Sequence, residues 1–183
     1  MFAVLAGVSM LATQLIPAGA LAATYSAELE GAYDWAYANG VTTMSPIDNA
    51  NMYGAISRAE MAKMLSVYAE EVLGMSPDAA RACNFTDINS VKGDLHDFII
   101  ESCRLGIMGQ GITEFRPYAT LSRAEFGTAL SRMLFGLADG EGDAYYSTHL
   151  EKLMSEWIIT NDNPRLDELR GYVMIMLMRS ANK

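Results

Sequence analysis

The sequence is poor in the residues that catalytic and metal centres use most. It contains 2 histidines and 2 cysteines, and His96 and His149 do not stand at ligand spacing from the cysteines. The motifs of a Ser-His-Asp site and of a phosphate-binding loop are missing as well. We therefore expect a protein that is not an enzyme and that uses no metal or other cofactor.

Positive charge is also scarce. The chain has 13 Lys and Arg against 22 Asp and Glu, a formal net charge of −9. A general nucleic-acid binder needs a basic surface to neutralise phosphates, so nucleic acid is excluded as a partner. An anionic ligand would have to be held by a few local arginines.

No lysine or arginine precedes Arg58. Residues 1–23 nevertheless have an apolar core, a break at Pro17 and a small-x-small sequence, as in a secretory signal peptide whose basic n-region is missing. Pro17 interrupts the apolar run too early for a membrane span. We expect export and cleavage of this segment; the alternative is a segment retained for assembly.

What the sequence does have is apolar periodicity. Hydrophobic residues make up 51% and charged residues 19%, which is typical of a folded domain. Apolar positions spaced by three and four predict an all-α fold. Two helices are expected to begin at Ser57 and Ser122, because each starts a Ser-Arg-Ala-Glu capping box in which Glu60 or Glu125 reaches back to the N-cap.

Arg58 and Arg123 are not explained by capping. A cation in the first turn opposes the helix dipole at a cost of about 0.3–1 kcal/mol. Its recurrence suggests that both arginines hold an anion, and the free amides of a helix N-terminus favour the same ligand. The alternative is that they form salt bridges at the surface or between lobes of the protein. Glu60 and Glu125 are interpreted as capping residues rather than as a catalytic pair.

One stretch carries a longer pattern. It begins with Phe85-x-Asp87 and continues through an amphipathic helix that ends at Gly106-Ile107, a glycine-rich turn and Phe115-x-Pro117 to the second capping box. This order closely resembles an S-layer homology repeat. The resemblance implies a pseudo-threefold bundle of three helix–loop–helix repeats. The corresponding segments are repeat 1 at 27–74, a connecting helix or loop at 75–84, repeat 2 at 85–136, an acidic glycine-rich linker at 137–144, and a degenerate repeat 3 at 145–181.

The outer repeats depart from the pattern. Repeat 1 has Gly40-Val41 in place of Gly106-Ile107, and either Met52 or Tyr53 fills the pocket of the missing Phe-x-Pro. In repeat 3, Arg170 aligns with Arg123, and Trp157 stands where the glycine should be. Leu169 and Tyr172 replace Ser and Glu of the box, so the cap is expected to have moved, with Asp167 as the candidate.

The resemblance also implies a ligand and a location. Members of that family use grooves between lobes to hold a secondary cell-wall polysaccharide, often through a pyruvylated sugar whose acidic group meets the signature arginine. Here this implies an exported protein at the cell wall that binds such a polysaccharide or another peptidoglycan-linked glycan. The alternative is a structural subunit of a surface layer or appendage, acting through self-assembly or through other surface proteins. The polysaccharide-binding residues expected are Arg58, Arg123, Arg170, Ser57, Ser122, Gly40, Gly106 and Asp87.

The two cysteines fit the same context. An exported chain with an even number of cysteines is a candidate for a disulfide. Cys83 precedes Phe85, and Cys103 lies on the helix before Gly106, so the two can meet within repeat 2. We predict that they form a disulfide.

Overall fold

The computed structural model describes residues 24–138 and 142–183. The predicted signal peptide at 1–23 and part of the predicted linker, 139–141, lie outside the described residues. The prediction of an all-α fold is confirmed, because the described residues form six α-helices and no strand.

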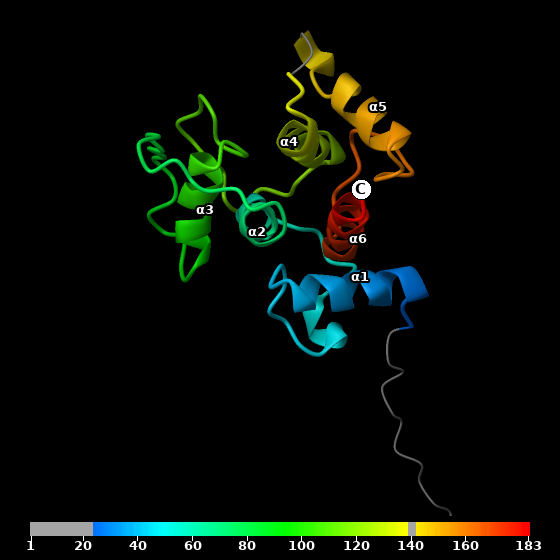
Figure 1. The fold of residues 1–183 in the computed structure, drawn as a ribbon. Coiled ribbons are helices and arrows are strands. Elements are labelled where there is room, and N and C mark those ends of the chain that lie inside the picture. The colour runs from blue at the N-terminus through cyan, green and yellow to red at the C-terminus, as the bar shows by residue number, and fades with distance from the viewer. Residues whose placement is uncertain (1–23, 139–141) are drawn as a thin grey trace, which may run out of the picture.

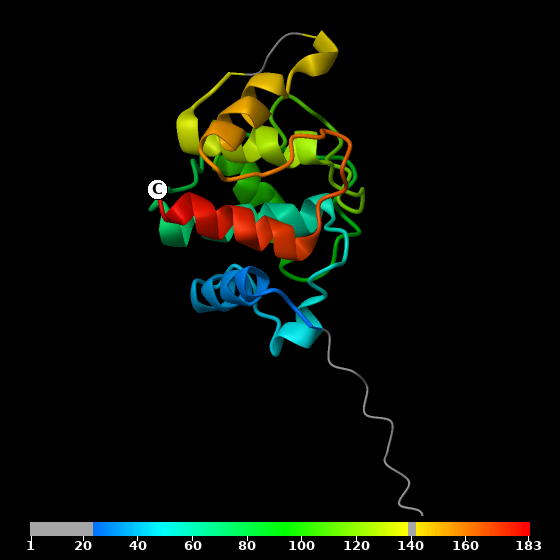
Figure 2. The same ribbon diagram turned by 90° about the vertical axis from the view of Figure 1, so that its right-hand side faces the viewer.

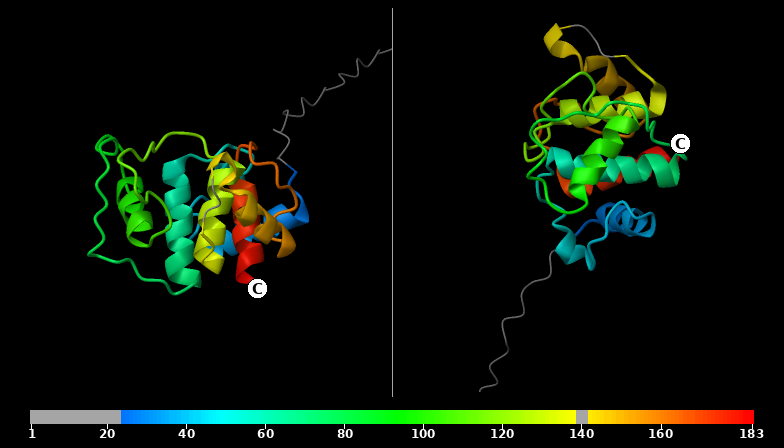
Figure 3. Two further views of the ribbon diagram at one scale, coloured as in Figure 1. Left: turned by 90° about the horizontal axis from the view of Figure 1, so that it is seen from above. Right: turned by 90° about the vertical axis from the view of Figure 1, so that its left-hand side faces the viewer.

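The helices form an inner and an outer set. Figure 1 views the inner helices nearly end-on, with the outer ones around them. Figure 3 shows the inner three side by side, running in one direction. The inner helices are α2 (Arg58–Val67), α4 (Arg123–Phe135) and α6 (Arg170–Ala181), and the outer helices are α1 (Ala27–Ala38), α3 (Leu95–Arg104) and α5 (Ser147–Ser155). Short helical turns occur at Ile47–Ala50, Tyr68–Val72 and Gly142–Ala144.

Each inner helix packs most closely against an outer helix of a different predicted repeat. The close pairs are α2 with α3, α4 with α5, and α6 with α1. The last pair joins the two ends of the described chain, as Figure 2 also shows. Their approach is tight, since a Cβ at Gly171 would lie 2.7 Å from Leu29 Cδ1. The α1–α6 contact therefore closes the arrangement into a ring of helix pairs.

Two of the inner helices begin as the sequence predicts. At Ser57 and at Ser122, the Ser hydroxyl accepts from the N–H of the box Glu, whose carboxylate accepts from the N-cap N–H. The third, α6, starts after Leu169 with no side-chain cap. The expectation that Asp167 replaces the cap is therefore wrong, since the N-cap position belongs to Leu169.

The outer helices end in a left-handed residue. Gly40 (φ 72°) follows α1, Gly106 (φ 78°) follows α3, and Trp157 (φ 58°) follows α5. Glycine adopts this conformation at no steric cost, whereas a side chain costs about 1–2 kcal/mol. Trp157 adopts the left-handed conformation although its side chain is 75% exposed and gains little from packing against the core.

The connection at 75–84 contains turns and no helix. Here Asp78 Oδ1 accepts from the Ala80 N–H, so the aspartate organises a turn. Cys83 Sγ is joined to Cys103 Sγ in a disulfide, which fastens this connection to α3. Of the two candidates for the missing aromatic of repeat 1, Met52 is buried and Tyr53 is exposed.

A continuous apolar core lies between the helix layers. Its largest fully buried side chains include Leu65, Phe126 and Leu153 on the helices, Tyr68 in the turn after α2, and Phe115 in the loop before α4. Burial of the Tyr68 phenol raises its pKa to about 12. In the part of the chain that the structure describes, no helix is both long enough and apolar enough to span a bilayer.

Candidate functional site

The three segments that precede the inner helices meet in a closed ring of backbone hydrogen bonds. The Ile56 N–H donates to Glu168 O (2.9 Å), the Leu121 N–H to Ile56 O (3.1 Å) and the Glu168 N–H to Leu121 O (2.8 Å). Each segment donates to one neighbour and accepts from the other. Ile56, Leu121 and Glu168 therefore occupy equivalent positions.

A second set of bonds relates the three arginines in the same way. The backbone N–H of each arginine donates to a carbonyl of a neighbouring segment. The pairs are Arg58 with Ala119 (3.0 Å), Arg123 with Leu166 (2.7 Å), and Arg170 with Gly54 (2.9 Å). The alignment of Arg170 with Arg123 thus agrees with the geometry. These bonds also consume the first amides of the inner helices, so the expectation that free helix amides hold the ligand is wrong.

Each arginine forms an ion pair across a junction between segments. Arg58 Nη1 lies 2.9 Å from Glu125 Oε1, and Arg170 Nη2 lies 2.6 Å from Glu60 Oε1. Arg123 pairs with Glu168 through two hydrogen bonds, Nε to Oε1 and Nη2 to Oε2. Salt bridges, the alternative interpretation of these arginines from the sequence, are thus present at all three.

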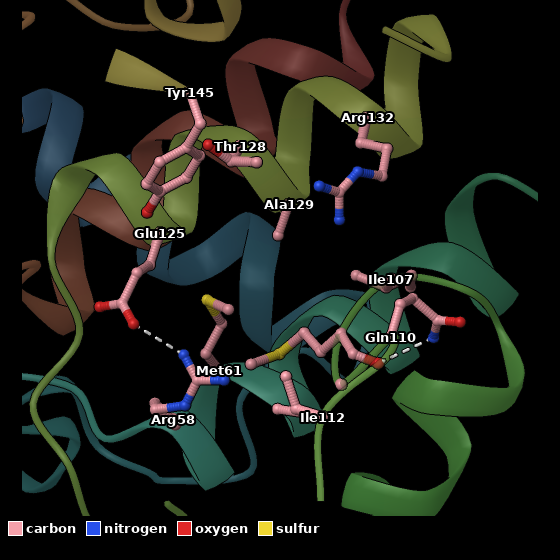
Figure 4. A pocket seen from close by; sticks show the side chains of 12 residues that line it. Arg58, Met61, Ile107, Gln110, Ile112, Glu125, Thr128, Ala129, Arg132 and Tyr145 are labelled. Atoms are coloured by element: carbon pink, nitrogen blue, oxygen red, sulfur yellow. Dashed lines mark hydrogen bonds and ion pairs between the residues drawn. The ribbon is translucent and has the colours of Figure 1, made fainter. Parts of the chain in front are cut away.

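Beside each arginine lies a groove between two inner helices. Groove 1, between α2 and α4, has a volume of about 540 Å³. Four parts of the chain line it: helix α2, the glycine-rich loop that follows α3, helix α4, and the segment before α5. The lining residues are Arg58, Met61, Ile107, Met108, Gly109, Gln110, Ile112, Glu125, Thr128, Ala129, Arg132 and Tyr145. Figure 4 shows Arg58 beside Glu125, Arg132 further along α4, and Tyr145 above Glu125.

Arg58 is fixed in groove 1 by its surroundings. Its Nε donates to Phe115 O (2.8 Å), and its guanidinium carbon lies 5.2 Å from the centre of the Phe115 ring. Burial lowers the pKa of Arg58, and the attraction of Glu125 opposes this effect. Within the described residues, Arg58 Nη2 makes no hydrogen bond. The arginine therefore keeps donors available for a ligand in the groove.

Asp87 supports Arg58 indirectly. Its carboxylate accepts from the Phe115 N–H (2.9 Å) and the Arg116 N–H (2.7 Å). Burial tends to raise the pKa of Asp87, but these two hydrogen bonds lower it overall. The Phe85 and Phe115 rings meet edge to face, 5.3 Å apart. The two motifs, Phe-x-Asp and Phe-x-Pro, thus come together to hold the carbonyl that accepts from Arg58.

The opposite wall of groove 1 is held by Gln110 and the disulfide. The Gln110 amide donates to Cys103 O and Met108 O, both at 3.0 Å, and accepts from Arg81 at 3.2 Å. Gly109 (φ 76°) allows the loop to pass Phe85, whose ring would lie 2.5 Å from an added Cβ. The glycine-rich turn is therefore a fixed wall.

Grooves 2 and 3 repeat this geometry with different residues. Groove 2, between α4 and α6, has a volume of about 310 Å³, and groove 3, between α6 and α2, about 220 Å³. In groove 2, Arg179 pairs with Glu28 at 2.6 Å. The charged residues that line groove 2 are Arg123, Arg179 and Glu28, and those that line groove 3 are Arg170, Lys63, Glu60 and Asp94.

Charge separates groove 1 from groove 3. In groove 3 the cations and carboxylates form two pairs, Arg170 with Glu60 and Lys63 with Asp94. In groove 1 the single lining carboxylate, Glu125, pairs with Arg58 and also with Arg116 (3.3 Å) on the rim. The described lining of groove 1 therefore contains two arginines and one carboxylate.

The predicted site residues fall into two groups. The arginines line the grooves, whereas the predicted serines, glycines and Asp87 do not. Instead, Ser57 and Ser122 are N-caps, Gly40 and Gly106 end helices, and Asp87 holds the Phe115 loop. The sequence reasoning missed four residues that shape the grooves: Glu168, Arg132, Arg179 and Tyr145.

Comparison of the sequence with models of known protein families and with curated proteins finds no match. Among the described residues, no group of three or more His, Cys, Asp or Glu side chains is placed to hold a metal ion.

Proposed function

We propose that this protein is a non-catalytic cell-surface module that binds an anionic cell-wall polysaccharide in groove 1. The observation that carries the proposal is Arg58, which lines this groove and, within the described residues, keeps its Nη2 without a hydrogen bond. The resemblance of residues 85–136 to an S-layer homology repeat supplies the class of ligand.

The contacts favour a sugar that carries a carboxylate. A guanidinium binds a carboxylate through parallel hydrogen bonds, and Arg58 has an unused Nη2 within the described residues. Because Arg58 is 7% exposed, the ligand would replace little water around a cation that is already desolvated. Tyr145 lines the same groove, with its ring above Glu125 (Figure 4). An acidic group on Arg58 and a sugar ring along Tyr145 would use both features.

Binding to purified cell-wall sacculi from the protein's own source tests the proposal. Wild type would be compared with Arg58→Gln and Arg132→Gln, and with Arg170→Gln as the matched control. Arg170 occupies the position equivalent to Arg58 and also forms an ion pair, but it lines groove 3. The control therefore removes a similar structural contact and leaves groove 1 intact.

We expect the two groove 1 variants to lose at least tenfold in affinity and the Arg170 variant to bind as wild type does. Mild acid that removes pyruvyl ketals from the sacculi should abolish wild-type binding if the anionic group is a ketal. Equal binding by folded wild type and Arg58→Gln would contradict the site, and no binding by folded wild type would contradict the function.

The exposed aromatic side chains favour a second candidate, a structural subunit that contacts other proteins. Tyr118 and Trp157 are 64% and 75% exposed, and Trp157 is held in a costly left-handed conformation. Self-association of the purified protein that is lost on Trp157→Ser, together with failure to bind sacculi, would favour this role over polysaccharide binding.

A further inference from the structure

Glu168 occupies a position that is apolar in the other two segments. The closed ring of hydrogen bonds makes it equivalent to Ile56 and Leu121. All three side chains are buried, with Glu168 at 0% exposure. A carboxylate is costly at such a place unless it is fully paired. A specific partner must therefore account for it.

That partner is Arg123. Both oxygens of Glu168 accept from this guanidinium, at Nε and Nη2, and Asn161 O accepts from Nη1. All three guanidinium nitrogens of Arg123 are engaged. Arg58, at the equivalent place, uses Nε and Nη1 only. Groove 2 thus has the arginine of groove 1 without its available donor edge.

The residue that pairs with Arg58 in groove 1 has changed in groove 2. Glu125 is the third residue of α4, and the third residue of α6 is Tyr172. Groove 2 therefore lacks the counterpart of Glu125 and has a carboxylate, Glu168, at the ring of hydrogen bonds instead. Its second cation, Arg179, is held by Glu28 through both Nε and Nη2. The carboxylates of the chain itself neutralise both cations of this groove.

We infer that Glu168 is an internal carboxylate that closes groove 2 to anionic ligands, whereas groove 1 stays open to an acidic sugar group. The inference rests on the proposed function and adds which groove is closed and the residue that closes it. Groove 2 retains the arginine, the loop carbonyl and the open volume of an anion site, and its own glutamate takes the place of the ligand.

The double variant Glu168→Leu/Tyr172→Glu tests this inference. It restores an apolar residue at the ring and a carboxylate at the third position of α6, as in groove 1. Glu168→Gln provides a second variant with nearly unchanged shape, should the double variant fail to fold. Leu121→Glu is the reciprocal change, because it places a carboxylate in the equivalent ring position next to Arg58.

The measurement is a titration with glucuronate, followed through the side-chain ¹⁵N–¹H signals of Arg58 Nε and Arg123 Nε in the purified protein. In wild type, we expect the Arg58 signal to shift and the Arg123 signal to stay unchanged. In the double variant or in Glu168→Gln, both signals should shift. In folded Leu121→Glu, the response of Arg58 should fall at least tenfold.

The outcomes separate this inference from the proposed function. A response of Arg123 in wild type, or none in a folded Glu168 variant whose Arg58 does respond, would overturn the inference and leave the function standing. Response of Arg123 in a Glu168 variant while Arg58 stays silent in all proteins would refute binding in groove 1 and support closure of groove 2. Silence of both arginines in every folded protein would refute both.

Discussion

Grooves 1 and 2 place the same residue in the same backbone environment and give it different partners. Arg58 meets Glu125, which is 25% exposed at the edge of its groove, whereas Arg123 meets Glu168, which is completely buried at the ring. The difference arises at two positions. The ring position before the inner helix is Leu121 in one segment and Glu168 in the other, and the third helical residue is Glu125 in α4 and Tyr172 in α6. A signature arginine can therefore bind a ligand or lock a structure, depending on where the nearest carboxylate stands.

The electrostatics of the carboxylates follow the same division. Burial raises the pKa of Glu168, and the hydrogen bonds from Arg123 oppose the rise. Burial also tends to raise the pKa of Glu60, but the Ser57 N–H and Arg170 lower it overall. The partners of Glu60, at a groove edge, thus favour its charged form, whereas Glu168, at the ring, depends on the guanidinium of Arg123 to remain charged.

The largest effect is expected from breaking the buried pair on one side. Arg123→Met should lower the free energy of unfolding by about 3–5 kcal/mol, because it leaves Glu168 buried without a partner. The double variant Arg123→Met/Glu168→Leu should recover most of this loss. Urea denaturation measures both, and similar stabilities for the single and double variants would contradict a coupled pair.

Arg58→Met is the matched control in groove 1. It should cost about 1–3 kcal/mol, less than Arg123→Met, because Glu125 is partly exposed to water and keeps Arg116. A larger loss for Arg58→Met than for Arg123→Met would reverse the comparison.

The second prediction concerns the wall of groove 1. Cys83→Ser/Cys103→Ser removes a disulfide that closes a loop of sequence separation 20, which should cost about 3 kcal/mol. Gln110 loses its fixed position as well, because it donates to the Cys103 carbonyl. Thermal unfolding with and without reductant measures the effect on wild type. The double Ser variant is the control, since reductant should not change its transition.

The third prediction compares the helix starts. Ser57→Ala and Ser122→Ala should each cost about 1 kcal/mol, because each removes a cap that satisfies a helix amide. Leu169→Ala, at the uncapped start of α6, should not show this capping loss. Urea midpoints compare the three, and an unchanged midpoint for both Ser variants would show that the boxes contribute little.

Trp157 gives the fourth prediction, at the loop that leads into groove 2. Trp157→Gly should raise stability by about 1 kcal/mol, since glycine adopts the left-handed conformation freely. Gly106→Ala, at the equivalent place before groove 1, should lower it, because its Cβ would meet Arg81 Nη1 at 2.6 Å. If both changes were destabilising, Trp157 would make contacts that offset its conformational cost.

The smallest effect is in the pH dependence of the groove 3 pair. The pKa of Glu60 is below its ordinary value of 4.5, so its contribution to stability is complete above pH 4.5 and is lost as the pH falls through the lowered pKa. The stability difference between wild type and Glu60→Gln should therefore be constant near neutral pH and shrink in acid. A difference that grows in acid would contradict this sign.

The sequence predicted where two of the inner helices begin, but it did not predict which helices pack against each other. The starts of α2 and α4 followed from Ser57 and Ser122, because a capping box is built from residues three apart. That α2 packs on α3, and α1 on the distant α6, was not predicted, since an apolar helix face does not specify which face covers it. The interpretation as three S-layer homology repeats stays a prediction.

Glu168 shows where a sequence signal was present and unused. Alignment of Arg170 with Arg123 already places Glu168 opposite Leu121, and a carboxylate in an apolar column indicates a buried partner. The identity of that partner depended on the ring of hydrogen bonds, which joins residues 47 to 112 positions apart along the chain. Arg132 and Arg179 likewise gain meaning only from the grooves they line.

The pairing of α1 with α6 also has a consequence for synthesis. Of the described helices, α1 is made first and finds its partner in α6, so a nascent chain keeps the apolar face of α1 uncovered until residues 170–181 follow. Contacts of this sequence separation close late and slow the final step of folding. A stop codon just before α6 would therefore leave α1 without the helix that covers its apolar face.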